Sequence, residues 1–189
     1  MKAYGAELVE YGDDFNEAFD HAQSLAEDRG LHMFPSIHPR LIQGVGTGSL
    51  ELLRTAPSLD TVYVPVGMGP GICGMIAARN ALGLDTRVVG VVAANAATYA
   101  LSFAQKKPIA TDSANTLADG LAVRLLHPGA LEYMLGDVER IVTVSEEEIL
   151  AAIHHYFNDT HNVTECAGVR TACSVQTMTD RSKMWTEPV

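Results

Sequence analysis

Thr61-Val-Tyr-Val-Pro-Val-Gly-Met-Gly-Pro-Gly-Ile-Cys-Gly74 has the features of a strand, a glycine-rich turn and the beginning of a helix, in that order. The apolar, β-branched run 62–66 predicts a buried strand, and the small residues at 75–79 predict a helix. A turn at a helix N-terminus has free backbone N–H groups at the positive end of the helix dipole, so we predict that this turn binds a phosphate-like anion. The turn consists of Gly67, Met68, Gly69, Pro70 and Gly71.

Strands and helices alternate on the C-terminal side of this turn. The runs 62–66 and 87–92 are apolar on both faces, which is typical of a parallel sheet covered by helices on both sides. Ser145-Glu-Glu-Glu148 has the pattern of a capping box and predicts the start of a helix. The predicted fold class is therefore α/β. The predicted elements are strands at 86–92 and 139–144 and helices at 97–105, at 128–135 and from 146 onward.

The N-terminal part of the chain has its own pattern. We expect short strands at 6–11 and 31–34. Between them, Asp14-Phe-Asn-Glu17 predicts a capped helix that ends at Gly30.

A further helix is predicted over 41–54, although Gly44, Gly46 and Gly48 lie inside it. Each glycine in a helix interior costs about 1 kcal/mol relative to alanine. We therefore expect another segment to approach this backbone closely.

Composition excludes several classes of function. The chain has 189 residues, enough for one or two domains, and a net charge of −10, which argues against binding to nucleic acid or to an anionic membrane. Cys73, Cys166 and Cys173 form no CxxC pair, which fits a reducing compartment. The first residues lack the apolar run of a signal peptide, and no apolar run is long enough to span a membrane. A cytoplasmic protein is expected.

The glycine turn has to be compared with two nucleotide-binding motifs and with a purely structural role. Gly69-Pro-Gly-Ile-Cys-Gly74 matches the GxGxxG pattern of dinucleotide sites, but the next strand ends at Val91-Val-Ala-Ala-Asn95 without the acidic residue that would bind the ribose. A Walker motif is excluded because no Gly-Lys-Ser/Thr follows. The structural role, in which the glycines only allow tight packing of strand and helix, stays open.

Five stretches taken together resemble the pyridoxal-phosphate-dependent threonine and serine dehydratases, the fold type II group that includes serine racemase. The resemblance runs from Met1 to about Gly168. It implies an incomplete, Rossmann-like large domain in which the glycine turn binds the cofactor phosphate and Glu165 lies near the cofactor ring. The stretches are Tyr4-Gly-Ala-Glu-Leu-Val9, Pro65-Val-Gly-Met-Gly-Pro-Gly-Ile-Cys-Gly74, Ala118-Asp-Gly-Leu-Ala-Val-Arg124, Val142-Thr-Val-Ser-Glu-Glu-Glu148 and Glu165-Cys-Ala-Gly168.

The same resemblance implies a division of the chain and two missing parts. Residues 1–30 correspond to a strand and helix of the family's small domain, 31–168 to the large-domain core, and 169–189 to a divergent tail. The family's Schiff-base lysine and its substrate-carboxylate loop would lie upstream of this sequence, and a strand with a turn facing the pyridine nitrogen would lie downstream. We therefore expect a truncated chain, and no catalytic residue is assigned.

The available lysines support that expectation. They are Lys2, Lys106, Lys107 and Lys183, all in terminal or polar loop contexts. Solvated lysines keep a pKa of about 10.4 and are poor nucleophiles at neutral pH. Pro70 has no N–H group and Met68 adds a side chain, so phosphate affinity should be reduced.

No metal site is predicted. His154 and His161 share a helix face, but no third ligand is evident. Some relatives hold a divalent cation with carboxylates after the strand at 86–92, where this chain has Val92, Ala96 and Thr98.

Two functional hypotheses follow. In the first, the chain is a threonine/serine dehydratase-like fragment, inactive alone or completed by another chain. In the second, it is a non-catalytic module that binds pyridoxal phosphate or another phosphorylated ligand, or that only self-associates. Open strand edges favour a homodimer in either case.

Overall fold

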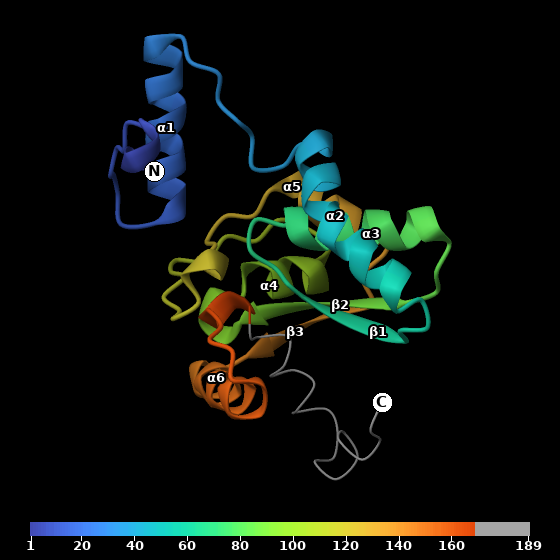
Figure 1. Ribbon diagram of the computed structural model, residues 1–189. Coiled ribbons are helices and arrows are strands. Elements are labelled where there is room, and N and C mark those ends of the chain that lie inside the picture. Colours follow the sequence, from blue (N-terminus) through green and yellow to red (C-terminus); the bar gives the residue numbers. More distant parts are fainter. Residues whose placement is uncertain (169–189) are drawn as a thin grey trace. The chain divides into compact units, whose positions relative to one another are not determined.

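The computed structural model describes residues 1–168 and divides into two compact units, Met1–Pro35 and Ser36–Val189 (Figure 1). The predicted tail, 169–189, lies outside the described residues. The division into two units falls at Pro35, where the chain passes from the segment that contains α1 to the one that contains the sheet.

The first unit contains the short helix η1 (Lys2–Tyr4) and the helix α1 (Phe15–Arg29). The Asp14 side chain caps α1 by accepting a hydrogen bond from the Glu17 N–H at 2.9 Å, and the helix ends at Gly30 with φ 64°. The prediction of this helix is therefore confirmed. The predicted strands at 6–11 and 31–34 are wrong, because neither segment pairs with another strand among residues 1–168.

The second unit contains a parallel sheet with the strand order β1-β2-β3. Val64 of β1 pairs with Gly90 of β2, which pairs in turn with Ile141 of β3. The predicted α/β class with a parallel sheet is confirmed. The elements are α2 (Pro39–Thr55), β1 (Thr61–Pro65), α3 (Pro70–Leu82), β2 (Arg87–Ala93), η2 (Ala94–Ala96), α4 (Thr98–Gln105), η3 (Asp119–Leu121), α5 (Pro128–Leu135), β3 (Arg140–Val144) and α6 (Glu146–Thr160).

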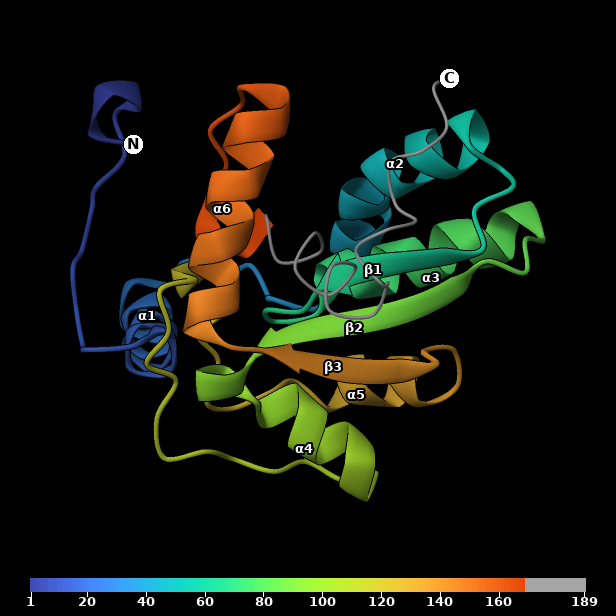
Figure 2. The same cartoon turned by 90° about the horizontal axis from the view of Figure 1, so that it is seen from below.

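The helices of this unit cover both faces of the sheet. Figures 1 and 2 show α2, α3 and α5 on one side and α6 on the other. Val88 and Val92 of β2 belong to the core on the α3 and α5 side, whereas Val91 packs with Ile149 of α6. β2 is therefore buried on both faces, as its uninterrupted apolar sequence predicts.

A close crossing of α2 and α3 explains one of the glycines in α2. A Cβ atom on Gly74 would lie 2.9 Å from the Cα of Gly46, and one on Gly46 would lie 3.2 Å from the carbonyl oxygen of Gly74. The expected close approach is thus confirmed at Gly46. Gly44 and Gly48 have no atom within 4 Å of a Cβ position, so contact with another described segment does not explain them.

The last helix begins with the predicted capping box. The Ser145 hydroxyl accepts from the Glu148 N–H, and the Glu148 carboxylate accepts from the Ser145 N–H at 2.8 Å. Ile149 is buried, but Tyr156 and Phe157 on the last turns are exposed. The apolar face of α6 is therefore buried only near its start.

Candidate functional site

The glycine turn connects the end of β1 to the start of α3. The Val66 N–H donates to the Val91 carbonyl at 2.9 Å, which fixes the chain against β2 before the turn. Gly69 is the N-cap of α3 with φ 108°, a conformation that favours glycine, and no side chain of residues 1–168 caps the helix. Strand, turn and helix start therefore occur where the sequence predicts them.

The first N–H groups of α3 lack acceptors in the part of the chain that the structure describes. Intrahelical bonding begins with the Cys73 N–H, which donates to the Gly69 carbonyl at 3.1 Å. Within residues 1–168, no acceptor is found for the backbone N–H groups of the glycine turn and of the first turn of α3. Pro70 has no backbone N–H group. These free donors belong to Gly67, Met68, Gly69, Gly71 and Ile72.

The glycines of the turn have two different environments. A Cβ atom on Gly67 would lie 2.6 Å from the Gly120 carbonyl oxygen, and one on Gly69 would lie 2.7 Å from the Ala130 Cβ. At these two positions the glycines allow tight packing, as the structural role of the turn predicts, because a larger residue would not fit. A Cβ atom on Gly71 would meet no described atom within 4 Å, so none of residues 1–168 fills the space beside Gly71.

Met68 does not fill that space. Its side chain is half-buried and packs against the main core, on the side where α3 and α5 cover the sheet. Its backbone N–H remains among the free donors of the turn.

Tyr99 is a residue of the site that the sequence analysis missed. Its hydroxyl donates to the Met68 carbonyl at 2.8 Å, and the side chain is only 1% exposed. Burial raises the pKa of Tyr99 well above its usual value, so the hydroxyl keeps its proton. The available signal was a tyrosine in an apolar helix, since a buried phenol needs a hydrogen-bond partner.

Glu165 is exposed and directly precedes a helical turn at 166–168. Ala167 of that turn is buried against Ala118 and Leu121. Because the neighbouring Gly120 carbonyl borders Gly67, the Glu165–Gly168 element and the glycine turn contact the same short segment. The Glu165 carbonyl accepts a hydrogen bond from the hydroxyl of the preceding Thr164 at 3.3 Å.

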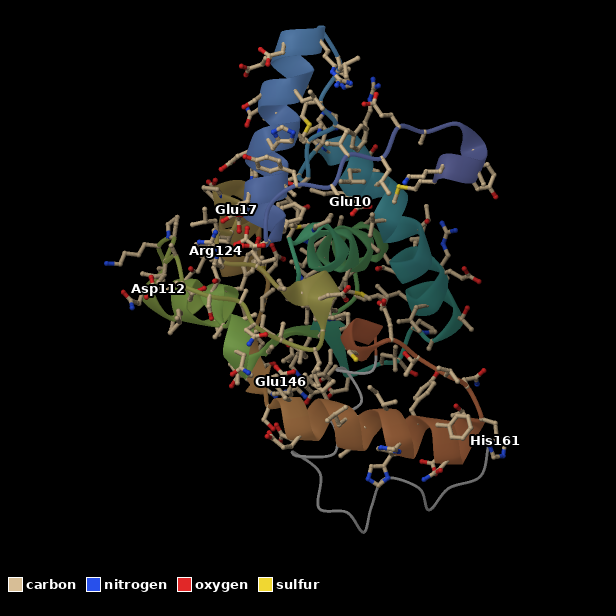
Figure 3. All side chains as sticks on the ribbon, turned by 90° about the vertical axis from the view of Figure 1, so that its left-hand side faces the viewer. Glu10, Glu17, Asp112, Arg124, Glu146 and His161 are labelled. Atoms are coloured by element: carbon tan, nitrogen blue, oxygen red, sulfur yellow. The ribbon has the colours of Figure 1, made fainter. Side chains whose placement is uncertain are left out.

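The segment between α4 and α5 is held in place by side chains from two helices. Thr98 donates to the Val123 carbonyl at 2.9 Å, and Glu146 at the start of α6 accepts from the Leu117 N–H at 2.9 Å. Figure 3 shows Glu146 there, together with Asp112 and Arg124 on the segment itself. These contacts fix the backbone around Gly120 and therefore one wall of the glycine turn.

Lys106 and Lys107 are exposed and lie at the C-terminal end of α4. Tyr99 touches the turn from the other end of that helix, about 10 Å away along the axis at about 1.5 Å per residue. Lys2 belongs to the other compact unit, and Lys183 lies outside the described residues.

Cys73 on the first turn of α3 is fully buried, and burial raises the pKa of its thiol from 9.0 to about 11. Its packing role, rather than a reactive thiolate, is therefore supported. In the part of the chain that the structure describes, no three His, Cys, Asp or Glu side chains are grouped as metal ligands. No helix among residues 1–168 is long and apolar enough to cross a membrane.

Comparison with protein families gives a match over nearly the whole chain. The family described as "Pyridoxal-phosphate dependent enzyme" matches residues 1–183. The mitochondrial threonine dehydratase of Saccharomyces cerevisiae is 35% identical over 168 residues, which cover 87% of this chain and 29% of the relative. The L-threonine ammonia-lyase of Thermotoga maritima is 34% identical over 167 residues, covering 87% of this chain and 41% of that protein.

Solved structures show the same likeness. The processed form of threonine deaminase isoform 2 from Solanum lycopersicum superposes with a TM-score of 0.85 and 28% identity, over 95% of this chain and 51% of that one. Maize serine racemase gives a TM-score of 0.85 at 26% identity, over 98% of this chain and 56% of that one. The chain thus spans well under two thirds of the length of the relatives it matches.

Proposed function

The chain belongs to the family of pyridoxal-phosphate dependent enzymes, and we propose that it is a threonine dehydratase-like part that binds the cofactor phosphate at its glycine turn. The family's cofactor is pyridoxal phosphate. The proposed phosphate ligands are the backbone N–H groups of Gly67, Met68, Gly69 and Gly71, with Glu165 near the cofactor ring.

One observation carries the proposal: backbone donors without an acceptor among residues 1–168 lie next to a space that none of these residues fills. The N–H groups of the turn lack acceptors within residues 1–168, and the Gly71 side faces no described atom within 4 Å. Such donors at a helix N-terminus suit a phosphate group, which accepts several hydrogen bonds at once. Pro70 leaves one donor fewer, so we expect binding that is weaker than with an uninterrupted row of N–H groups.

Bound pyridoxal phosphate would supply an electron sink for chemistry at the α-carbon of an amino acid. The residues described here contribute binding and orientation. Dehydration of a hydroxy amino acid, with release of a 2-oxo acid and ammonia, also requires a lysine to hold the cofactor and move a proton. Lys106 and Lys107 are exposed at the far end of α4, so we propose that this chain alone has no dehydratase activity.

The second candidate function is a non-catalytic module that self-associates. It is favoured by the sheet, because among residues 1–168 β1 and β3 each pair only with β2. Outer strands of a sheet are common places for another chain to add. This module would bind a phosphorylated ligand or an amino acid without turning it over.

Labelling tests whether a lysine of this chain reaches the bound cofactor. The purified chain is incubated with pyridoxal phosphate, reduced with borohydride, and digested to locate the modified lysine by mass spectrometry. Modification of one lysine, abolished by a competing phosphate ester, would contradict the proposed inactivity of the chain alone, and scattered labelling of exposed lysines such as Lys2, Lys106 and Lys107 would support it. Threonine and serine should give no 2-oxo acid with this chain; turnover by pure protein contradicts the proposed inactivity.

We also propose a cytoplasmic location and a homodimer. The cysteine content supports the former, although the yeast relative is named mitochondrial. Cell fractionation tests the location, and a fraction confined to an organelle would contradict it.

A further inference from the structure

The hydroxyl of Tyr99 is bonded to the backbone of the glycine turn rather than to a side chain. It donates to the Met68 carbonyl at 2.8 Å, across 31 residues of sequence. The same hydroxyl would lie 3.2 Å from a Cβ atom on Gly69. Tyr99 therefore contacts the peptide unit that joins Met68 to Gly69.

The geometry of that peptide unit links the hydroxyl to the anion donors. A trans peptide is planar, and its C=O and N–H bonds point in opposite directions. Since Tyr99 draws the Met68 carbonyl toward the buried side of the turn, the Gly69 N–H points to the opposite side. Gly69 has φ 108°, and glycine crosses between backbone regions easily, so nothing in its own covalent structure prevents rotation of this unit.

A rotated peptide would reverse the electrostatics of the turn. It would replace a donor N–H by an acceptor carbonyl oxygen on the side where we propose that the anion binds. An acceptor repels a phosphate oxygen, so the turn would lose one donor and gain one repulsive contact.

The residue before Tyr99 holds the other wall of the turn. Thr98 is fully buried and donates to the Val123 carbonyl at 2.9 Å, while Gly120 on the same segment borders Gly67. The start of α4 thus fixes both the turn and the segment that faces it.

We propose that Tyr99 is a positioning residue for phosphate binding, because its hydroxyl holds the Met68–Gly69 peptide in the orientation that presents the Gly69 N–H to the anion. This inference rests on the proposed phosphate site at the turn. Tyr99 would act on phosphate binding through the backbone of the turn and would not touch the ligand.

Tyr99→Phe tests the proposal, since it removes the hydroxyl and keeps the ring in the core. Binding of pyridoxamine 5′-phosphate and of pyridoxamine is measured by titration calorimetry; neither compound carries an aldehyde, so exposed lysines do not react. Tyr133→Phe on α5 is the matched control, because its side chain is 42% exposed. Urea unfolding of each variant shows that the protein compared is folded.

We expect Tyr99→Phe to weaken pyridoxamine 5′-phosphate binding about 3- to 10-fold, the value of one hydrogen bond, and to leave pyridoxamine binding unchanged. A purely structural role would weaken both ligands equally, which overturns the proposal. Equal binding of the phosphorylated ligand by wild type and Tyr99→Phe also overturns it, while the phosphate site stands. If the wild-type protein does not distinguish the two ligands, the phosphate site itself is refuted and Tyr99 loses its proposed role with it.

Discussion

The glycines of the turn differ in whether the surrounding described residues leave room for a side chain. Gly67 and Gly69 are enclosed by Gly120, Ala130 and Tyr99, so any side chain there would collide with backbone or core. Beside Gly71, by contrast, no atom of residues 1–168 lies within 4 Å of a Cβ position. Sequence alone could predict the strand, the turn and the start of the helix, because a glycine turn between a strand and a helix is a local pattern. It could not predict Tyr99, whose partner lies 31 residues away.

Gly71→Ala should separate ligand binding from stability. Alanine suits a helix better than glycine by about 1 kcal/mol, and its methyl group meets no described protein atom within 4 Å. The free energy of unfolding should therefore be unchanged or higher, whereas the methyl group occupies the space proposed for phosphate. Calorimetric titration with pyridoxamine 5′-phosphate should show binding weakened by about tenfold or more, or about 1.4 kcal/mol. Unchanged affinity would place the ligand elsewhere.

Cys73 predicts a pH dependence of stability. The folded-state pKa is raised from 9.0 to about 11, so the folded protein keeps a proton that the unfolded chain loses. This contribution is complete below pH 9.0 and is lost as the pH rises toward about 11. The difference in unfolding free energy between wild type and Cys73→Ala should therefore shrink over that range, as measured by urea denaturation. A constant difference would mean that the thiol is not desolvated.

Among the elements, those with local signals are the ones that sequence could predict. Asp14 and Ser145 cap α1 and α6 where a capping pattern occurs, and the apolar runs became β1, β2 and β3. The short runs 6–11 and 31–34 form no strands, since pairing depends on a partner and not on the run itself. The glycines of α2 also show that a contact depends on its partner, because their spacing in the sequence could not show which of them packs against α3.

Gly74→Ala should destabilise the α2–α3 crossing. Its Cβ would lie 2.9 Å from the backbone of Gly46, and overpacking of this kind costs about 1–3 kcal/mol. Gly48→Ala is the control, because no described atom lies within 4 Å and the helix gains about 1 kcal/mol. Urea denaturation measures both changes. A neutral Gly74→Ala variant would show that the two helices separate at no cost.

For the chain as a whole, the family is shown but the activity remains a proposal. The chain spans 29% of the yeast threonine dehydratase and 41% of the Thermotoga enzyme. The proposed division at 30 and 168 and the role of Glu165 stay predictions. Experiments on this chain can therefore best test what it contributes to cofactor binding.

For the whole molecule we predict self-association. In the sheet that residues 1–168 form, β1 and β3 are the outer strands, and the outer strands of a sheet are common places for a second copy of a chain to add. Sedimentation velocity over a wide concentration range should show a shift from monomer to dimer. A single monomeric species at every concentration would contradict the proposed homodimer.

The central claim is that backbone N–H groups of the glycine turn bind phosphate. Glycine-selective 15N labelling and an NMR titration with pyridoxamine 5′-phosphate test it directly, with pyridoxamine as the control. We predict downfield shifts of the Gly67, Gly69 and Gly71 amide protons that saturate together and are absent with pyridoxamine. Shifts confined to other glycines, or identical with both ligands, would contradict the claim.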